Sequence, residues 1–221
     1  MKEIKNIIKQ MTNFDKVFAI LFSISLISIQ LITDSTMISL LCSCLGIAYV
    51  ILARLGHRFS MIFGAIQALL YCMISFKATI FGDFMLNLYN VIFMTYGYIQ
   101  WNKNKKNNQL EIRDLDKKQS LKVIIIMIII YTTLVLILKK ANGYNYFLDA
   151  FTTTVSMTGL YLMAMRFRQC WIAWNINNIF SMILWTTLLF NGNANAPVMI
   201  AMFFCYTCNS ILGYIDWYKK K

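Results

Sequence analysis

The sequence has few charged residues, one proline and one histidine. Charged side chains make up 14% of its 221 residues, hydrophobic ones make up 59%, and Pro197 and His57 are the single members of their types. A soluble domain is about one quarter charged, so this composition excludes an ordinary soluble protein and favours several membrane-spanning segments. The opening residues MKEIKNIIKQM mix both charge signs with isoleucine and do not have the pattern of a cleaved secretory signal.

The sequence also lacks the residue sets that enzymes and ion-coupled pumps need. It contains no Walker A motif, no Ser/His/Asp set and no second half to the Cys205-x-x-Cys208 pair, and its six cysteines lie in or beside apolar runs. All nine acidic residues fall at the ends of apolar stretches or in loops, whereas proton and ion relays place them inside. We therefore expect neither an enzyme nor an ion-driven carrier, with no cofactor and no metal.

Eight stretches are apolar over about 20 residues, the length that crosses a bilayer as a helix. The sequence thus predicts an all-α integral membrane protein with residues 1–221 in one transmembrane domain. Residues 102–119 are polar and are predicted to be a solvated loop, and residues 1–12 a short amphipathic helix on the membrane surface. The predicted spans are 14–33, 36–54, 59–77, 80–101, 120–138, 145–165, 169–190 and 197–217.

The basic residues predict the orientation. If the N-terminus is cytoplasmic, the inner segments hold 18 of the 21 Lys and Arg residues and the outer ones hold only Lys77, Lys139 and Lys140. This is a strong positive-inside bias, and it places both termini in the cytoplasm of a bacterial cytoplasmic membrane. It also explains the net charge of +12 by contacts with anionic membrane lipid, so nucleic acid is not an expected partner.

Spans two to four resemble spans six to eight. GYIQW at 97–101 matches GYIDW at 213–217, and CMISF at 72–76 matches SMILW at 181–185. Because one span lies between the two units, both run in the same direction, a plan that transporters use with the substrate near the bilayer midplane. The predicted 1+3+1+3 order is the N-terminal segment and extra helix in 1–33, the units in 36–101 and 145–217, and the connecting helix in 120–138.

Seven carboxamides lie inside the predicted spans and more than three residues from a span end. A single amide in a span often bonds to a neighbouring helix, but their concentration in the inner spans of both units favours a shared polar site. They are Gln67, Asn87, Asn90, Asn175, Asn177, Asn178 and Asn209.

The stretch WIAWNINN at 171–178 combines such amides with two tryptophans. Trp171, Trp174 and Asn178 share one helix face, which suits a flat, cationic ligand and a polar group beside it. Asn175 lies between them in phase, whereas Asn177 points elsewhere and is expected to pack against a helix. Two other tryptophans, Trp101 and Trp217, end their spans beside polar or basic residues and are expected to be interfacial anchors.

These motifs resemble those of the PnuC-type vitamin transporters. WxxWxxxN at 171–178, the stretch from Gly64 to Asn90 and NSILGYIDW at 209–217 are each similar to a family pattern, and the resemblance covers about residues 36–221. It implies facilitated uptake of nicotinamide riboside, driven by phosphorylation of the substrate in the cytoplasm. Carried over by position, Trp171 and Trp174 would clamp the substrate and Asn178 would read its polar groups.

The resemblance leaves the substrate open. Asn87 and Gln67 would contribute to the site from the first unit, and Asn90, Asn209 and Asn175 are further candidates. Residues 93–95 read Phe-Met-Thr, where many nicotinamide riboside transporters have Pro-Met-Gln, so thiamine, riboflavin or a deoxynucleoside is an alternative. A SWEET-type sugar facilitator and a non-transport sensor or assembly factor are further alternatives, and a homo-oligomer stays open.

Overall fold

In the computed structural model, residues 11–33, 35–106 and 109–219 are described, and within them the chain forms eight long helices. Each of the eight predicted spans is a helix, with ends within three residues of the prediction. The expected surface helix over residues 1–12 falls mostly on residues 1–10, outside the described part. The helices are α2 (Asn13–Ile32), α3 (Met37–Leu55), α4 (Ser60–Lys77), α5 (Phe81–Lys103), α6 (Lys117–Lys140), α7 (Tyr146–Ala164), α8 (Cys170–Phe190) and α9 (Ala196–Lys219).

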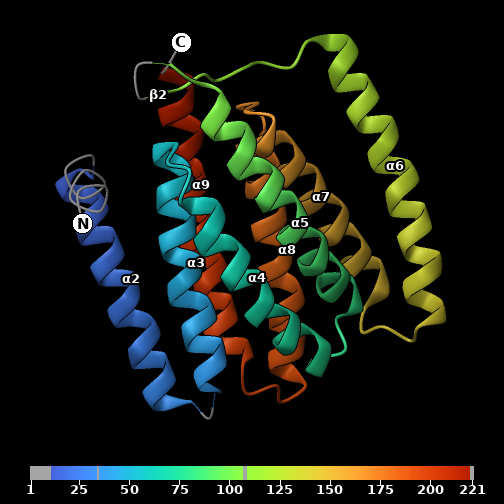
Figure 1. Ribbon diagram of the computed structural model, residues 1–221. Coiled ribbons are helices and arrows are strands. Elements are labelled where there is room, and N and C mark those ends of the chain that lie inside the picture. The colour runs from blue at the N-terminus through green and yellow to red at the C-terminus, as the bar shows by residue number, and fades with distance from the viewer. Residues whose placement is uncertain (1–10, 34, 107–108, 220–221) are drawn as a thin grey trace.

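Six of these helices pack in a ring. α3 contacts α4, α4 contacts α5, α5 contacts α7, α7 contacts α8, α8 contacts α9, and α9 returns to α3. α2 lies outside the ring against α3 and α9, and α6 lies outside it against α7 (Figure 1). Followed along the chain, α3 and α7 run in the same direction, as do α4 and α8 and also α5 and α9 (Figure 1). This arrangement supports two parallel three-helix units, α3–α5 and α7–α9, with α2 and α6 as the extra helices.

The helices differ in hydropathy according to the polar side chains that they bury. By length and composition, α2, α3, α4, α6 and α9 are apolar enough to cross a membrane. Polar residues that are buried lower the hydropathy of the others, such as Asn87 and Asn90 in α5 and Asn177 and Asn178 in α8. Since lipid offers no hydrogen bonds, these side chains turn into the ring, while the peripheral α6 exposes a surface of isoleucines and leucines.

Trp101 and Trp217 close the ring at one end, and neither side chain is exposed. The indole N–H of Trp101 donates to the Met163 carbonyl, and that of Trp217 donates to the Arg54 carbonyl, both at 3.0 Å. Arg54 and Met163 are each the second-to-last residue of their helix, α3 and α7, so the two bonds are equivalent contacts in the two units. The prediction that these tryptophans are interfacial anchors is therefore wrong, because each joins the last helix of one unit to the first helix of the other.

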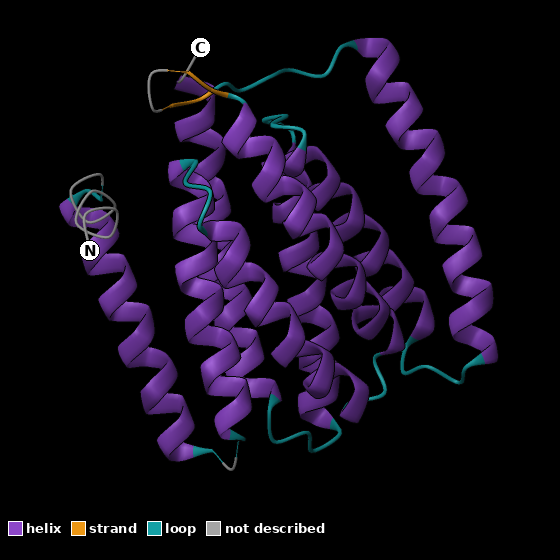
Figure 2. Ribbon diagram, viewed as in Figure 1, coloured by secondary structure: helices purple, strands orange, loops and turns teal. Residues whose placement is uncertain are grey.

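The segment 102–119 is more ordered than a solvated loop. Two short antiparallel strands, β1 (Lys105–Lys106) and β2 (Gln109–Leu110), begin it (Figure 2). Beyond them, the Arg113 N–H donates to the Arg166 carbonyl at 2.8 Å, and the Arg168 N–H donates to the Arg113 carbonyl at 3.0 Å. The side chain of Arg168 also pairs with Asp114 at 2.5 Å. The described side chains of this segment are exposed or half-buried, as expected of a solvated segment, but polar composition does not reveal the backbone pairing with the α7–α8 turn.

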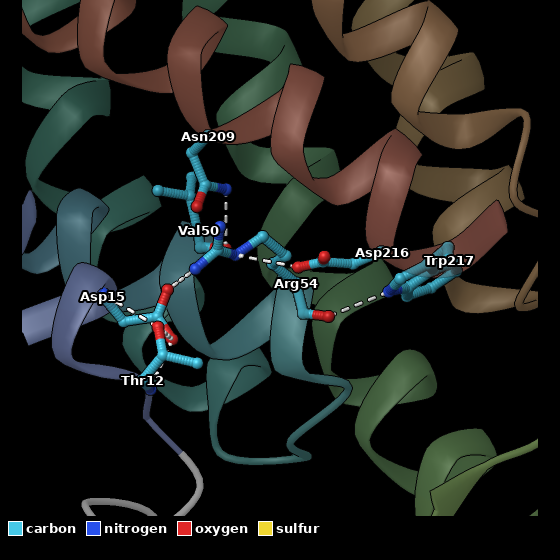
Figure 3. A network of polar contacts seen from close by, with 7 residues as sticks. All are labelled: Thr12, Asp15, Val50, Arg54, Asn209, Asp216 and Trp217. Atoms are coloured by element: carbon cyan, nitrogen blue, oxygen red, sulfur yellow. Dashed lines mark hydrogen bonds and ion pairs between the residues drawn. The ribbon is translucent and has the colours of Figure 1, made fainter. Parts of the chain in front are cut away.

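Arg54 ties α2 to the ring (Figure 3). Its guanidinium forms an ion pair with Asp15 of α2 and a longer one, at 3.6 Å, with Asp216 of α9. Asp15 also accepts the backbone N–H of Thr12 at 2.8 Å, which completes a capping box at the start of α2. Both Arg54 and Asp15 are buried, so this contact fixes the helix at a position where little else is polar.

We expect Asp15→Asn to destabilise the protein, because it removes the charge and keeps the capping oxygen. Breaking a buried ion pair costs about 3–5 kcal/mol, and Asp216 remains beside Arg54, so a loss of about 2 kcal/mol in the free energy of unfolding is expected. The melting temperature of the purified protein in detergent measures this. Asp116→Asn is the control, since Asp116 is the N-cap residue of the capping box on α6 and forms none of the ion pairs seen between described residues. Equal losses in the two variants would mean that Asp15 acts only as a cap.

Candidate functional site

A cavity of about 60 Å³ lies inside the ring near the middle of the helices, and each of the six ring helices contributes to its wall. Gln67 of α4 and Asn87 and Asn90 of α5 line it from the first unit. Trp174 and Asn178 of α8 line it from the second unit. Five side chains that the sequence predicted from separate spans therefore meet on one wall.

A smaller cavity of about 40 Å³ lies nearer the end of the ring where Trp101 and Trp217 sit. It is lined by Trp171 and Asn209, which do not line the central cavity. Trp174 and Asn178 line both cavities, as do two tyrosines, Tyr49 and Tyr206. These last four residues form the layer that the two cavities share.

Several lining residues carry a buried polar atom without a hydrogen-bond partner among the described residues. Such an atom costs about 1–3 kcal/mol when left unsatisfied, and folded proteins rarely keep more than a few of them. Both donors and acceptors are present, so the wall suits a ligand with polar groups of both kinds. The atoms are Asn90 Oδ1, Trp171 Nε1, Trp174 Nε1, Asn178 Oδ1, Tyr206 OH and Asn209 Oδ1.

The two tryptophans of the WxxWxxxN motif have different surroundings. Trp171 is 2% exposed, and its ring stands edge-on to that of Trp217 with the centroids 5.5 Å apart. A Cβ atom on Gly213 would lie 2.6 Å from the Cδ2 atom of Trp171, so glycine at this position is what lets α9 approach the indole. Trp174 is only partly buried and reaches both cavities. Trp174 is thus the more available of the two rings to a ligand in the central cavity.

The other amides of this region divide between packing and lining. Asn175 lines neither cavity: its Nδ2 donates to the Trp171 carbonyl at 2.9 Å, and its Oδ1 accepts the Ser210 hydroxyl of α9 at 2.9 Å. Asn209 donates to the Val50 carbonyl of α3 at 2.9 Å and leaves Oδ1 free of a partner. Asn177 was expected to point away from the site, and this is wrong, since it lines the central cavity.

Among the lining residues that sequence reasoning missed are three tyrosines and one acid, Tyr49, Tyr71, Tyr206 and Asp83. No periodicity distinguishes Tyr49 or Tyr206 from other aromatic residues of their helices. Tyr71 and Asp83 do lie within the stretch from Gly64 to Asn90 that carries a family pattern, which was the available signal. The acids were expected only at helix ends, and Asp83 is indeed the third residue of α5, but it is buried against the cavity.

Comparisons with known proteins match most of the chain. The family model described as "Nicotinamide mononucleotide transporter" matches residues 36–219. A protein of Neisseria mucosa named "Nicotinamide riboside transporter PnuC" is 28% identical over 94% of this chain and 82% of its own length. A protein of Haemophilus influenzae with the same name is 28% identical over 93% of this chain and 90% of its own length. The solved "Crystal structure of the Vitamin B3 transporter PnuC" is 26% identical, with a TM-score of 0.84 over 95% of this chain and 92% of that one.

Proposed function

The chain belongs to the nicotinamide mononucleotide transporter family, and we propose that it carries nicotinamide riboside across the cytoplasmic membrane by facilitated diffusion. It is a multi-pass membrane transporter of the PnuC type and not an enzyme. The central cavity is the proposed binding site, with Trp174 and Asn178 as its main contacts. Gln67, Asn87 and Asn90 contribute from the first unit, and Trp171 and Asn209 from the neighbouring cavity.

The observation that carries this proposal is the set of partnerless polar atoms beside an indole face in the middle of the ring. A pyridinium ring is flat and cationic, so it gains from an aromatic face that excludes water. The carboxamide and ribose hydroxyls offer donors and acceptors to the amides and the tyrosine hydroxyl. A ligand with these groups would remove several unsatisfied atoms at once.

The residues that line the central cavity favour nicotinamide riboside over nicotinamide mononucleotide, after which the family is named. A phosphate group is usually held by arginine, lysine or a helix N-terminus. Among the described residues that line the central cavity there is no lysine, arginine or histidine, and the charged residue present is Asp83. An added phosphate would therefore meet a carboxylate and amides, which supports a substrate without phosphate.

Thiamine is the alternative that these features also favour, because it too carries a flat cationic ring. The number of amides on the wall favours nicotinamide riboside, whose carboxamide and hydroxyls give them partners. The Phe93-Met94-Thr95 stretch departs from the pattern of many nicotinamide riboside transporters. Of the three, Met94 lines the cavity, and it is the residue that the two patterns share, whereas the departing Phe93 and Thr95 do not line it.

Alternating access is the proposed mechanism. A cavity of about 60 Å³ has room for only a few water molecules, so a nucleoside enters only after the helices move apart. Parallel units that rock about a site between them supply such a motion. Phosphorylation of the substrate by a separate cytoplasmic kinase then prevents its exit, so that uptake needs no ion gradient.

We expect nicotinamide riboside to raise the melting temperature of the purified protein more than thiamine, riboflavin, thymidine, nicotinamide mononucleotide or glucose. A ligand at a hundred times its Kd stabilises by about 2.7 kcal/mol, which corresponds to a shift of about 5–10 °C for a chain of this size. In proteoliposomes without a proton or sodium gradient, the same solute should enter until its concentrations are equal. If another solute gave a larger shift in melting temperature, that solute would be the substrate in place of nicotinamide riboside. Uptake that requires a gradient would refute facilitated diffusion.

A further inference from the structure

Asp83 places a carboxylate on the wall of the central cavity. It is 4% exposed and is the charged side chain among the described residues that line this cavity. Asp149 of α7, which is fully buried, lies beside it at the start of α5. The two acids come from different three-helix units, and the sequence predicted neither of them as a site residue.

The hydrogen bonds give the two carboxylates different roles. Asp149 accepts the backbone N–H groups of Gly82 at 2.8 Å and Asp83 at 3.1 Å, so the N-terminus of α5 stabilises its charge. The side chain of Asp83 accepts the Tyr71 hydroxyl at 2.9 Å, and the Tyr71 oxygen in turn accepts the indole N–H of Trp185 at 2.9 Å. Because an indole N–H only donates, the Tyr71 proton points to Asp83, which is thereby held as an acceptor.

Asp83 lacks a cation to balance its charge. In the described part of the chain, the ion pairs are formed by other acids, namely Asp15, Glu111, Asp114 and Asp216. A carboxylate buried in a membrane protein is costly unless it is paired, and acids in such places commonly serve as counter-ions of ligands.

A second observation at the same wall points to a ligand. The Oδ1 atoms of Asn90 and Asn178 have no hydrogen-bond partner among the described residues, and these side chains are 9% and 2% exposed. Both residues line the central cavity together with Asp83. The cavity thus combines a buried negative charge, two free acceptors and the indole of Trp174, all of which attract a positively charged, flat group.

We infer that Asp83 is the counter-charge for the cationic ring of the transported nucleoside. The inference rests on the proposed function, and it adds a selection rule to it: the site accepts cationic ring compounds and rejects neutral isosteres and anions. The Trp185–Tyr71 chain positions the carboxylate. Charge neutralisation on binding also fits a carrier that moves a cation through the membrane without a second ion.

The test compares nicotinamide riboside with benzamide riboside, its uncharged isostere with the same carboxamide and ribose. The wild-type protein is expected to bind the cation about tenfold or more tightly than the isostere. In Asp83→Asn, nicotinamide riboside should bind about tenfold more weakly, while benzamide riboside should change by less than about threefold. Isothermal titration calorimetry on the purified full chain gives both constants, and retained binding of the isostere reports that the variant is folded. Asp216→Asn, an acid outside both cavities, is the matched control and should keep the wild-type ratio.

Each other outcome has a defined meaning. Equal weakening of both ligands in Asp83→Asn would make Asp83 a hydroxyl acceptor and overturn the inference while the proposed function stands. The inference is also overturned, and the proposed function stands, if replacing sodium by choline in the buffer abolishes binding of nicotinamide riboside. In that case a bound sodium ion, and not the ligand ring, would balance the charge of Asp83. A wild-type protein that binds neither riboside refutes the proposed function. If the wild-type protein binds thiamine instead, the Asp83→Asn test compares thiamine with its neutral isostere deazathiamine. If the wild-type protein binds only neutral or anionic solutes, the inference about Asp83 is also refuted.

Discussion

Replacing Trp174 by alanine is expected to weaken the binding of nicotinamide riboside by about a hundredfold, and to cost less stability than the loss of a wholly buried tryptophan, because Trp174 packs against the core but is only partly buried. A desolvated cation–π contact contributes about 2 kcal/mol or more, and the lost ring surface adds to it, which together correspond to about two factors of ten in Kd. Trp174 is only partly buried, and its indole N–H has no hydrogen-bond partner among the described residues, so its removal breaks no hydrogen bond of the indole N–H with these residues. Titration calorimetry on the purified variant measures the change.

Asn178→Ala tests the polar side of the same site. Its Oδ1 has no partner in the described chain and its residue lines both cavities. A ligand group left without its acceptor loses about 1–3 kcal/mol, so we expect binding to weaken by about tenfold to a hundredfold. Ile176→Ala, on the outward face of the same helix and 39% exposed, is the control. Equal, small effects at all three positions would remove the site from α8.

Trp101 is an unsuitable control for these variants, although its place at the end of an apolar stretch suggested a tryptophan that takes no part in the fold. A tryptophan at the end of an apolar stretch is a signal for the membrane interface, and Trp101 and Trp217 both carry that signal. The signal gives depth in the membrane but not whether the ring faces lipid or a neighbouring helix. Since the contacts of both residues come from helices far away in the chain, only the three-dimensional structure assigns them.

The spans themselves were predictable because their cause is local. A run of about 20 apolar residues is needed to cross the bilayer whatever the neighbours are, and the eight observed helices end within three residues of the predicted limits. The pairing of Arg113 with the α7–α8 turn depends on a tertiary contact, whereas β1 and β2 pair locally with each other. Polar composition therefore predicted that the described side chains of this segment are exposed or half-buried, but it did not predict the backbone pairing.

Helical phase predicted part of the site and failed at its edges. It correctly grouped Trp174 and Asn178, which line the same cavities, but it placed Asn177 outside, where the structure puts it on the central wall. A ring interior touches more than one stripe of a helix, so residues about 100° apart can both reach it. Phase also says nothing about Tyr49 and Tyr206, which reach the cavity from other helices.

The helix groups α3–α5 and α7–α9 line one cavity together and are joined at both ends. Near the start of α5, Asp149 of the second unit caps a helix of the first, and Trp185 bonds to Tyr71 across the same boundary. At the opposite end, the indoles of Trp101 and Trp217 bond to Met163 and Arg54. The reciprocal pair at this end is the structural counterpart of the repeated GYIQW and GYIDW motifs. A rocking motion between the units must loosen one set of contacts while it keeps the other.

Trp217→Ala and Trp101→Ala are expected to produce the largest losses of stability among the variants considered. Each removes a wholly buried ring and its hydrogen bond to a backbone carbonyl. Tryptophan-to-alanine changes in a packed core cost about 3–5 kcal/mol. The Met163 carbonyl keeps the Arg166 N–H as a donor at 3.0 Å, so a further cost of about 1 kcal/mol or more for a carbonyl that loses its donor is expected only at Arg54, in Trp217→Ala. We expect both variants to lose much of their folded yield and to melt well below the wild-type protein in detergent. Phe190→Ala, at an 85% exposed position, should change the melting temperature little.

Trp101→Phe and Trp217→Phe separate the hydrogen bond from the ring. Each keeps an aromatic side chain and loses the indole N–H, so a smaller loss of about 1–3 kcal/mol is expected, equal in the two variants if the two units are equivalent. The rings lie 6.1 Å apart, so the double variant should differ from the sum of the single losses, as contacting aromatic pairs couple by about 0.5–1.5 kcal/mol. Melting temperatures of the two single variants and the double variant measure this coupling. Additive and unequal losses would mean that the two tryptophans act separately, and the parallel equivalence of the two units would lose its main structural support.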